Sequence, residues 1–126
     1  MVASLNTKVD LVVEGTSFIG INEYGEIMVG DNAFEFYNKR DSRKFIQIPW
    51  EEVDYVVASV MFKGRWIPRY GIQTKKNGMF TFSSKEPKKV LRAINVYIPR
   101  EKMLHSLSFF QVLRRGIGSR FNKKQK

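Results

Sequence analysis

Seven short segments rich in β-branched and aromatic residues, each bounded by turn-forming residues, constrain the fold more than any other feature of this sequence. They occupy residues 8–20, 26–29, 33–37, 44–48, 53–62, 69–75 and 79–82. The connections between them are shorter than the roughly dozen residues that a parallel crossover needs, so consecutive strands are expected to pair antiparallel. The sequence therefore predicts a mainly β (α+β) protein built on a meander of about seven strands.

Glycine, asparagine and proline set the expected strand ends. Tight turns are predicted at residues 24–25, 30–32 and 76–78, and the first strand is expected to bend at Gly15. Pro49 cannot donate to a sheet ladder, and the acids Glu51 and Glu52 favour the start of a helical turn. We expect one short turn there, with the neighbouring Trp50 covering the core. A catalytic pair of carboxylates is the less favoured alternative.

A helix that closes the sheet is expected at residues 84–98. Ser83 is the predicted N-cap, and Glu86 three residues later completes a capping box. An apolar stripe follows at Val90, Leu91, Ile94, Tyr97 and Ile98. After Pro99, apolar residues from Met103 to Leu113 predict a second helix that stops at Gly116, and a disordered tail is expected from Ser119.

Antiparallel strands followed by one amphipathic helix are typical of a bent sheet that rolls into a barrel with the helix at its open end. This arrangement resembles the pleckstrin-homology-like barrel, and the IPWEEV segment at residues 48–53 resembles the corner between its fourth and fifth strands. We expect a pleckstrin-homology-like domain at residues 1–99 and a helical, basic C-terminal extension at residues 100–126.

Residues 9 to about 113 also resemble a bacterial family, domain of unknown function 956, which includes the ManO proteins. The matching segments are LVVEGTSFIG, IPWEEVDYVVASV, GRWIPRYGIQT and FSSKEPKKVLRAIN. Genes of this family commonly lie beside those of a mannose-family phosphotransferase system. The resemblance implies a cytosolic accessory or regulatory protein of a sugar transporter, and it carries over no catalytic residue.

Catalytic chemistry has little support in the sequence. The chain contains no Cys, one His and no Gly-rich phosphate-binding loop, and its His and acidic residues lack metal-ligand spacing. We expect no enzyme activity and no cofactor. His105 is expected to be an ordinary surface residue, and a phosphate acceptor is the alternative. The N-terminus lacks the features of a signal peptide and no apolar run approaches the ~20 residues of a membrane span, which indicates a cytoplasmic protein.

The first candidate binding surface follows the predicted fifth strand and borders the sixth and seventh. It consists of the basic residues Lys63, Arg65, Arg69, Lys75 and Lys76, with the aromatic residues Trp66 and Tyr70 among them. A basic face with aromatic anchors binds lipid headgroups, phosphate or RNA bases, whereas the alternative is a solvated loop region. Trp66 is the expected anchor, because an exposed indole usually packs or binds.

The second candidate surface is the C-terminal extension. Residues 100–126 contain eight basic residues and one acid, so they carry seven of the ten net positive charges. The candidate contacts are Phe109, Phe110, Arg114, Arg115 and Arg120. Bulky apolar residues among cations favour a peripheral contact with an anionic membrane. Docking on the domain or on another copy of the chain is the alternative.

These patterns predict a non-enzymatic cytoplasmic regulator that acts by binding, at the inner face of the membrane. Its expected partners are the membrane components of a mannose-type phosphotransferase system or anionic lipid. The alternatives are a nucleic-acid-binding regulator, which no recognised motif supports, and a structural homo-oligomer.

Overall fold

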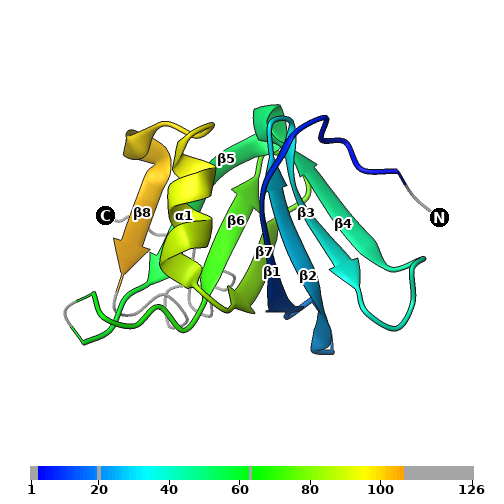
Figure 1. Ribbon diagram of the computed structural model, residues 1–126. Helices are drawn as coiled ribbons and strands as arrows, with labels where there is room; N and C mark the ends of the chain where they lie inside the picture. The colour runs from blue at the N-terminus through cyan, green and yellow to red at the C-terminus, as the bar shows by residue number, and fades with distance from the viewer. Residues whose placement is uncertain (1–2, 20, 63, 107–126) are drawn as a thin grey trace.

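The computed structural model describes residues 3–19, 21–62 and 64–106. These ranges are mostly β, with one open sheet of eight strands and one α-helix, which confirms the predicted class. The elements are β1 (Val9–Ser17), β2 (Glu23–Gly30), β3 (Ala33–Asn38), β4 (Phe45–Pro49), η1 (Trp50–Glu52), β5 (Val53–Ser59), β6 (Tyr70–Thr74), β7 (Met79–Ser84), α1 (Pro87–Asn95), η2 (Arg100–Lys102) and β8 (Met103–Ser106). Across the sheet the strands lie in the order β4-β3-β2-β1-β7-β6-β5-β8 (Figure 1).

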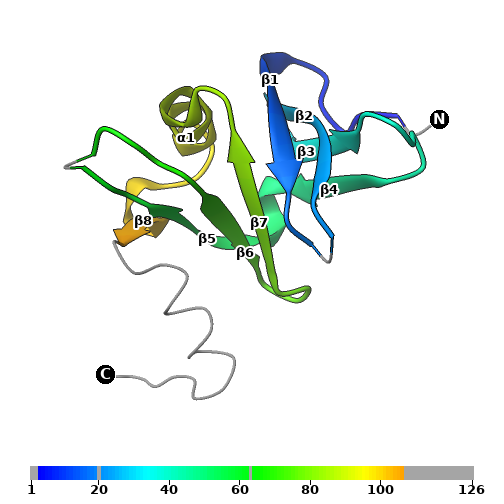
Figure 2. The same cartoon turned by 90° about the horizontal axis from the view of Figure 1, so that it is seen from below.

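Strand β1 joins the two halves of the sheet. It pairs with β2 along its length, but with β7 only at Gly15, Thr16 and Ser17. A Cβ atom at Gly15 would lie 2.5 Å from Cδ1 of Ile27 and 2.7 Å from the carbonyl oxygen of Ser83, so the close approach of these neighbours requires glycine. Figure 2 shows the halves β1–β4 and β5–β8 spreading to opposite sides of this junction.

The core forms where the two halves face each other. The ring of Phe82 from β7 lies 4.9 Å from that of Phe34 and 6.0 Å from that of Phe36, both on β3. Helix α1 adds Val90 and Ile94, which are fully buried in the same cluster. Burial of each such side chain contributes roughly 1.5–3 kcal/mol, so the helix is an integral part of the core.

The short turn expected after Pro49 is confirmed as η1. Trp50 donates its Nε1–H to the carbonyl oxygen of Gly30 at 2.9 Å, and its ring stacks on Tyr97 with centroids 5.3 Å apart. The Glu51 and Glu52 side chains are exposed at the surface of the turn. Trp50 therefore packs between the sheet and the segment after α1, as expected.

The turn expected at residues 24–25 is wrong, because Gly25 lies inside β2. It pairs with Gly15 of β1 and with Asn38 of β3, and the chain instead reverses between Ser17 and Glu23. A Cβ atom at Gly25 would collide with the carbonyl oxygen of Tyr37 in β3. Glycine is required here by the close approach of a strand, not by turn geometry.

The predicted capping box is also wrong. Ser83 and Ser84 extend β7 and pair with Thr16 and Gly15 of β1, and α1 begins only at Pro87. Glu86 precedes the helix with a left-handed φ of 50°, and no side chain caps the first turn. The sheet takes the backbone of the two serines, so the helix is shorter than the expected 84–98.

Residues Met103–Ser106 form a strand, so the helix expected from Met103 onward is wrong over these residues. This strand, β8, pairs in parallel with β5, with Met103 opposite Val56 and Leu104 opposite Val57. The sheet therefore extends beyond residue 99. The rest of the expected second helix and the tail lie outside the described residues.

An unpredicted N-terminal segment covers the outer face of β3 and encloses Glu35. This side chain is fully buried. Its carboxylate accepts hydrogen bonds from the Ser4 hydroxyl (2.6 Å), the Leu5 backbone N–H (2.7 Å), the Asn6 amide (3.1 Å) and the Gln47 amide (3.2 Å). Four neutral donors satisfy the buried carboxyl group, and three of them hold residues 4–6 against the sheet.

Candidate functional site

The connections β1–β2, β3–β4 and β5–β6 all lie toward the bottom of Figure 1, where β8 also ends at Ser106, and Figure 2 shows β5–β6 and β3–β4 on opposite sides of this end. We call it the loop end, defined by residues 18–22, 39–44 and 60–69. The opposite end, here the turn end, consists of residues 31–32, 50–52, 75–78 and 96–102. Since β5 and β8 are parallel, the chain that continues from Ser106 starts at the loop end.

Exposed apolar side chains concentrate at the loop end. Seven of the twelve exposed large hydrophobic residues in the described chain lie in its connections or in the adjoining strand residues. They are Ile19, Ile21, Tyr24, Phe45, Met61, Phe62 and Trp66. More than half of the exposed large apolar residues in the described chain therefore stand in or beside these connections, and connections are where binding residues are most often found.

Basic side chains accompany these apolar residues. The described residues of the loop-end connections include six basic residues and one acid, whereas the turn-end segments contain four of each. A hollow of about 400 Å³ lies between the β1–β2 and β3–β4 connections, lined among others by Ile21, Arg40 and Lys44. The Arg69 guanidinium stacks over the ring of Phe18, 4.1 Å from its centroid, and so links the β5–β6 connection to β1–β2.

The β5–β6 connection presents two aromatic rings to solvent. Strand β5 ends at Ser59, earlier than the expected Phe62, and Met61 then forms an isolated bridge with Trp66. The rings of Phe62 and Trp66 stack with centroids 6.0 Å apart, and 66% and 51% of their surfaces are exposed. Phe62 has a left-handed φ of 55°, which is rare for a bulky residue. An exposed aromatic pair on a strained backbone points to a function in binding.

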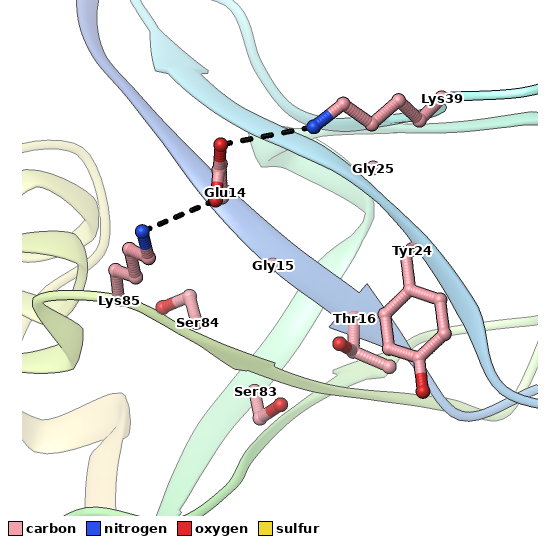
Figure 3. Close-up of a pocket in the computed structure, with 9 residues that line it drawn as sticks. All are labelled: Glu14, Gly15, Thr16, Tyr24, Gly25, Lys39, Ser83, Ser84 and Lys85. Carbon is pink, nitrogen blue, oxygen red and sulfur yellow. Dashed lines mark ion pairs between the residues drawn. The ribbon is translucent and has the colours of Figure 1, made fainter.

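A shallow groove crosses the outer face beside the junction of β1, β2 and β7 (Figure 3). Its volume is about 290 Å³, and it is lined by Glu14, Gly15, Thr16, Tyr24, Gly25, Lys39, Ser83, Ser84 and Lys85. The Nζ atoms of Lys85 and Lys39 lie 3.2 and 3.7 Å from the two carboxylate oxygens of Glu14. A hydrogen bond from Lys85, and then the charges of Lys85 and Lys39, hold the pKa of the Glu14 carboxyl below its usual value.

The family model described as "Domain of unknown function (DUF956)" matches residues 1–117. The chain belongs to this family. Among solved structures, this DUF956 chain is similar to one titled "Crystal structure of the C-terminal domain of an unknown protein from Leishmania infantum", with 10% identity and a TM-score of 0.62. That similarity covers 71% of this chain and 83% of the other, and at such low identity it is a likeness of fold alone. No curated protein matches this DUF956 chain.

The residues described for this DUF956 member include no helix that is long and apolar enough to cross a membrane. Over the same residues, no three His, Asp or Glu side chains lie close enough together to hold a metal ion. His105 lies on β8 with its side chain exposed, opposite Ala58 of β5.

The structure divides the first binding surface predicted for this DUF956 member. Arg65, Trp66 and Arg69 lie at the loop end, whereas Lys75 and Lys76 lie in the β6–β7 turn at the other end of β6. Tyr70 is fully buried in the core, so its place on this surface was wrong. The remaining candidates, Lys63, Phe109, Phe110, Arg114, Arg115 and Arg120, lie outside the described residues.

Sequence reasoning missed the parts of the loop end contributed by β1–β2 and β3–β4. Ile21 and the cations of residues 39–43 carried a usable signal, since both stand in segments already expected to be connections. Alternate connections of an antiparallel meander lie at the same end, so the expected strand directions were already enough to place these connections on the side of Trp66.

Proposed function

We propose that this protein is a non-enzymatic regulator of a mannose-type phosphotransferase system that docks at the inner face of the membrane. Docking uses the loop end together with the basic extension, against anionic lipid or the membrane components of the transporter. The observation that carries the proposal is the concentration of exposed apolar and basic side chains at one end of the fold.

The fold supports this proposal through its shape. We infer that the bent sheet is a pleckstrin-homology-like barrel, because two half-sheets meet at β1 and share one core with α1. In such an arrangement the side chains of both half-sheets are used in the core, and the connections remain available for recognition. Function is therefore expected in the loops.

The energetics of peripheral binding favour the loop end over the turn end. Each basic residue near an anionic leaflet contributes about 1 kcal/mol, and inserted apolar groups add to this. The Phe62 and Trp66 rings are the most suitable anchors because they are exposed, adjacent and already stacked. Strand β8 ends at Ser106 at the same end, and the sequence after it adds positive charge.

The transporter assignment rests on the family. Membership of DUF956, together with the resemblance to the ManO proteins, supports a partner in a mannose-type phosphotransferase system. Affinity capture of the tagged full chain from membranes is expected to recover the membrane components of that system. Recovery of the chain without them, from cells in which the transporter is produced, would contradict this part of the proposal.

Co-sedimentation with vesicles tests the docking surface. The protein should bind vesicles of phosphatidylcholine and phosphatidylglycerol and dissociate from them at high salt. It should not bind vesicles of phosphatidylcholine alone. Reversing two charges at the loop end, Arg40→Glu with Arg65→Glu, should weaken binding at least about tenfold. The matched control, Lys75→Glu with Lys76→Glu, makes the same change in net charge at the turn end and should weaken binding far less.

The aromatic anchors and the extension are tested separately. Replacing Phe62 and Trp66 with Ala should weaken vesicle binding, whereas Val96→Ala, at a residue of the turn end that is 73% exposed, should not. Removing residues 114–126 should release the protein from anionic vesicles. Docking through the loop end is contradicted if both pairs of charge reversals weaken vesicle binding equally. It is also contradicted if the truncated protein binds vesicles as well as the full chain.

A further inference from the structure

The groove of Figure 3 contains a feature that membrane docking does not explain. Two lysines from connections far apart in the sequence, Lys39 after β3 and Lys85 after β7, approach the same carboxylate from opposite sides. Their side chains are 65% and 75% exposed, so neither is held in place by the core. In the described part of the chain both lysines form their ion pairs with Glu14, so this carboxylate holds the two ammonium groups over the groove.

We propose that this groove binds a small phosphate-bearing ligand, and that Glu14 competes with the ligand for Lys39 and Lys85. Displacement of the Glu14 side chain leaves both ammonium groups to the phosphate oxygens. The proposal goes beyond the proposed function, because the groove lies on the outer face of the sheet and does not require a membrane.

Charge explains why a phosphate group can displace Glu14. A phosphate monoester carries about −1.5 to −2 at neutral pH and offers three strong acceptor oxygens, whereas a carboxylate carries −1 and offers two. Lysine ammonium groups are compact charges that suit phosphate oxygens. The two lysines are therefore neutralised more fully by a phosphate monoester than by Glu14.

Neighbouring hydroxyl groups complete the site. Thr16 and Ser83 are directly paired residues of β1 and β7, and Tyr24 also lines the groove. Ser84 lines it too, but its hydroxyl already accepts a hydrogen bond from the buried Tyr70 hydroxyl at 2.7 Å. Hydroxyl groups donate to phosphate oxygens and also accept from the hydroxyls of a ligand body. The volume of about 290 Å³ is near the lower limit of ordinary ligand sites, which favours a small molecule or one headgroup.

Two sources can supply this chemistry: a free phosphate monoester or a lipid headgroup with a terminal phosphate. Amide chemical shifts of the full chain are followed while glycerol phosphate is added, with sodium chloride at equal ionic strength as the reference. Shifts should centre on Thr16, Tyr24 and residues 83–85. A parallel arm uses phosphatidylcholine vesicles containing phosphatidic acid, and binding in that arm alone assigns the site to a headgroup.

The decisive variant is Glu14→Gln, which removes the competing carboxylate. It should tighten glycerol phosphate binding about three- to tenfold, as loss of two surface ion pairs allows. Glu26→Gln is the matched control, since Glu26 lies directly opposite Glu14 on β2, is exposed, and does not line the groove. Lys39→Met and Lys85→Met should each weaken binding, whereas Lys88→Met on α1 should not.

Three results overturn the proposal. If Glu14→Gln and Glu26→Gln tighten glycerol phosphate binding equally, the effect comes from net charge and not from competition by Glu14. Equal shifts with sodium chloride show that phosphate is not recognised, and the absence of ligand-induced shifts at the groove in both arms removes the site. Lys39 belongs both to the groove and to the loop end, but Arg40 and Arg65 do not line the groove, so the variants at those two residues test docking separately.

Discussion

Replacing Glu35 with Ala should loosen the N-terminal segment and lower the free energy of unfolding by about 2–4 kcal/mol. The carboxylate accepts four hydrogen bonds in a fully buried position. Buried hydrogen bonds to a charged group contribute about 1.5–3 kcal/mol each, so their full sum would be larger. Two of the donors retain other acceptors: the Asn6 amide at the Ala33 carbonyl oxygen and the Gln47 amide at the Ala3 carbonyl oxygen. The lost stability therefore comes mainly from the hydrogen bonds donated by Ser4 and Leu5.

The loosening should be limited to the first part of the segment. Asn6 accepts from the backbone N–H groups of Asn32 and Ala33 at 2.8 Å each, and Asp31 accepts from the backbone of Thr7 and Lys8 at 2.9 and 3.0 Å. These bonds do not involve Glu35. Hydrogen exchange should therefore become fast at the Leu5 amide while the Thr7 and Lys8 amides remain protected.

Urea denaturation and amide exchange measure the two effects. The control is Glu26→Ala, an exposed glutamate on the neighbouring β2, which should change stability by less than about 0.5 kcal/mol. A Glu35→Ala variant that keeps both its stability and its protection at Leu5 would refute the reasoning, because the buried carboxylate would then contribute nothing to holding the segment.

Three further perturbations follow from single contacts. Gly25→Ala should destabilise the sheet by about 3 kcal/mol or more in urea denaturation, since a Cβ atom there meets the Tyr37 carbonyl oxygen; a change below about 1 kcal/mol would contradict the close approach. Phe62→Gly should raise stability by about 1 kcal/mol by relieving a left-handed backbone, and at the same time weaken vesicle binding; loss of stability would argue against strain at this position. The Tyr97 hydroxyl donates to Asp10, and this hydrogen bond raises the tyrosine pKa to about 12 from 10.0, so its stabilising contribution is present below pH 10 and is lost as the pH rises through 12. Between pH 10 and 12 the parent should lose more thermal stability than Tyr97→Phe, and equal losses would exclude this contribution.

Several elements were predictable because their causes are local. The Lys76-Asn77-Gly78 turn forms as expected, with Gly78 at a φ of 81° and the Thr74 N–H bonded to its carbonyl oxygen at 2.9 Å. The turn after Pro49 was predictable because proline has no backbone N–H to donate to a sheet ladder. The stripe containing Val90 and Ile94 follows from helical periodicity. In each case the determining residues are neighbours in the sequence.

The failures share a different physical cause. Ser83 and Ser84 had the chemistry of a helix cap, but the edge of β1 was available to their backbone and the sheet extended. Met103 had helical spacing, but β5 offered a free edge and β8 formed on it. The residue pattern of one segment carries no information about an unpaired strand edge elsewhere in the fold. Pairing with such an edge outweighed the helix propensity of both segments.

The sequence by itself determined the β class, most strand positions, the helix stripe, the uneven charge and the absence of thiol chemistry, because these depend on composition and short-range spacing. Only the tertiary structure decided that Arg69 stacks on Phe18, that Glu35 is enclosed by the N-terminal segment, and that Lys39 and Lys85 meet at Glu14. These relations depend on strand order and on how far side chains reach across it, and neither quantity is encoded in any single stretch of residues.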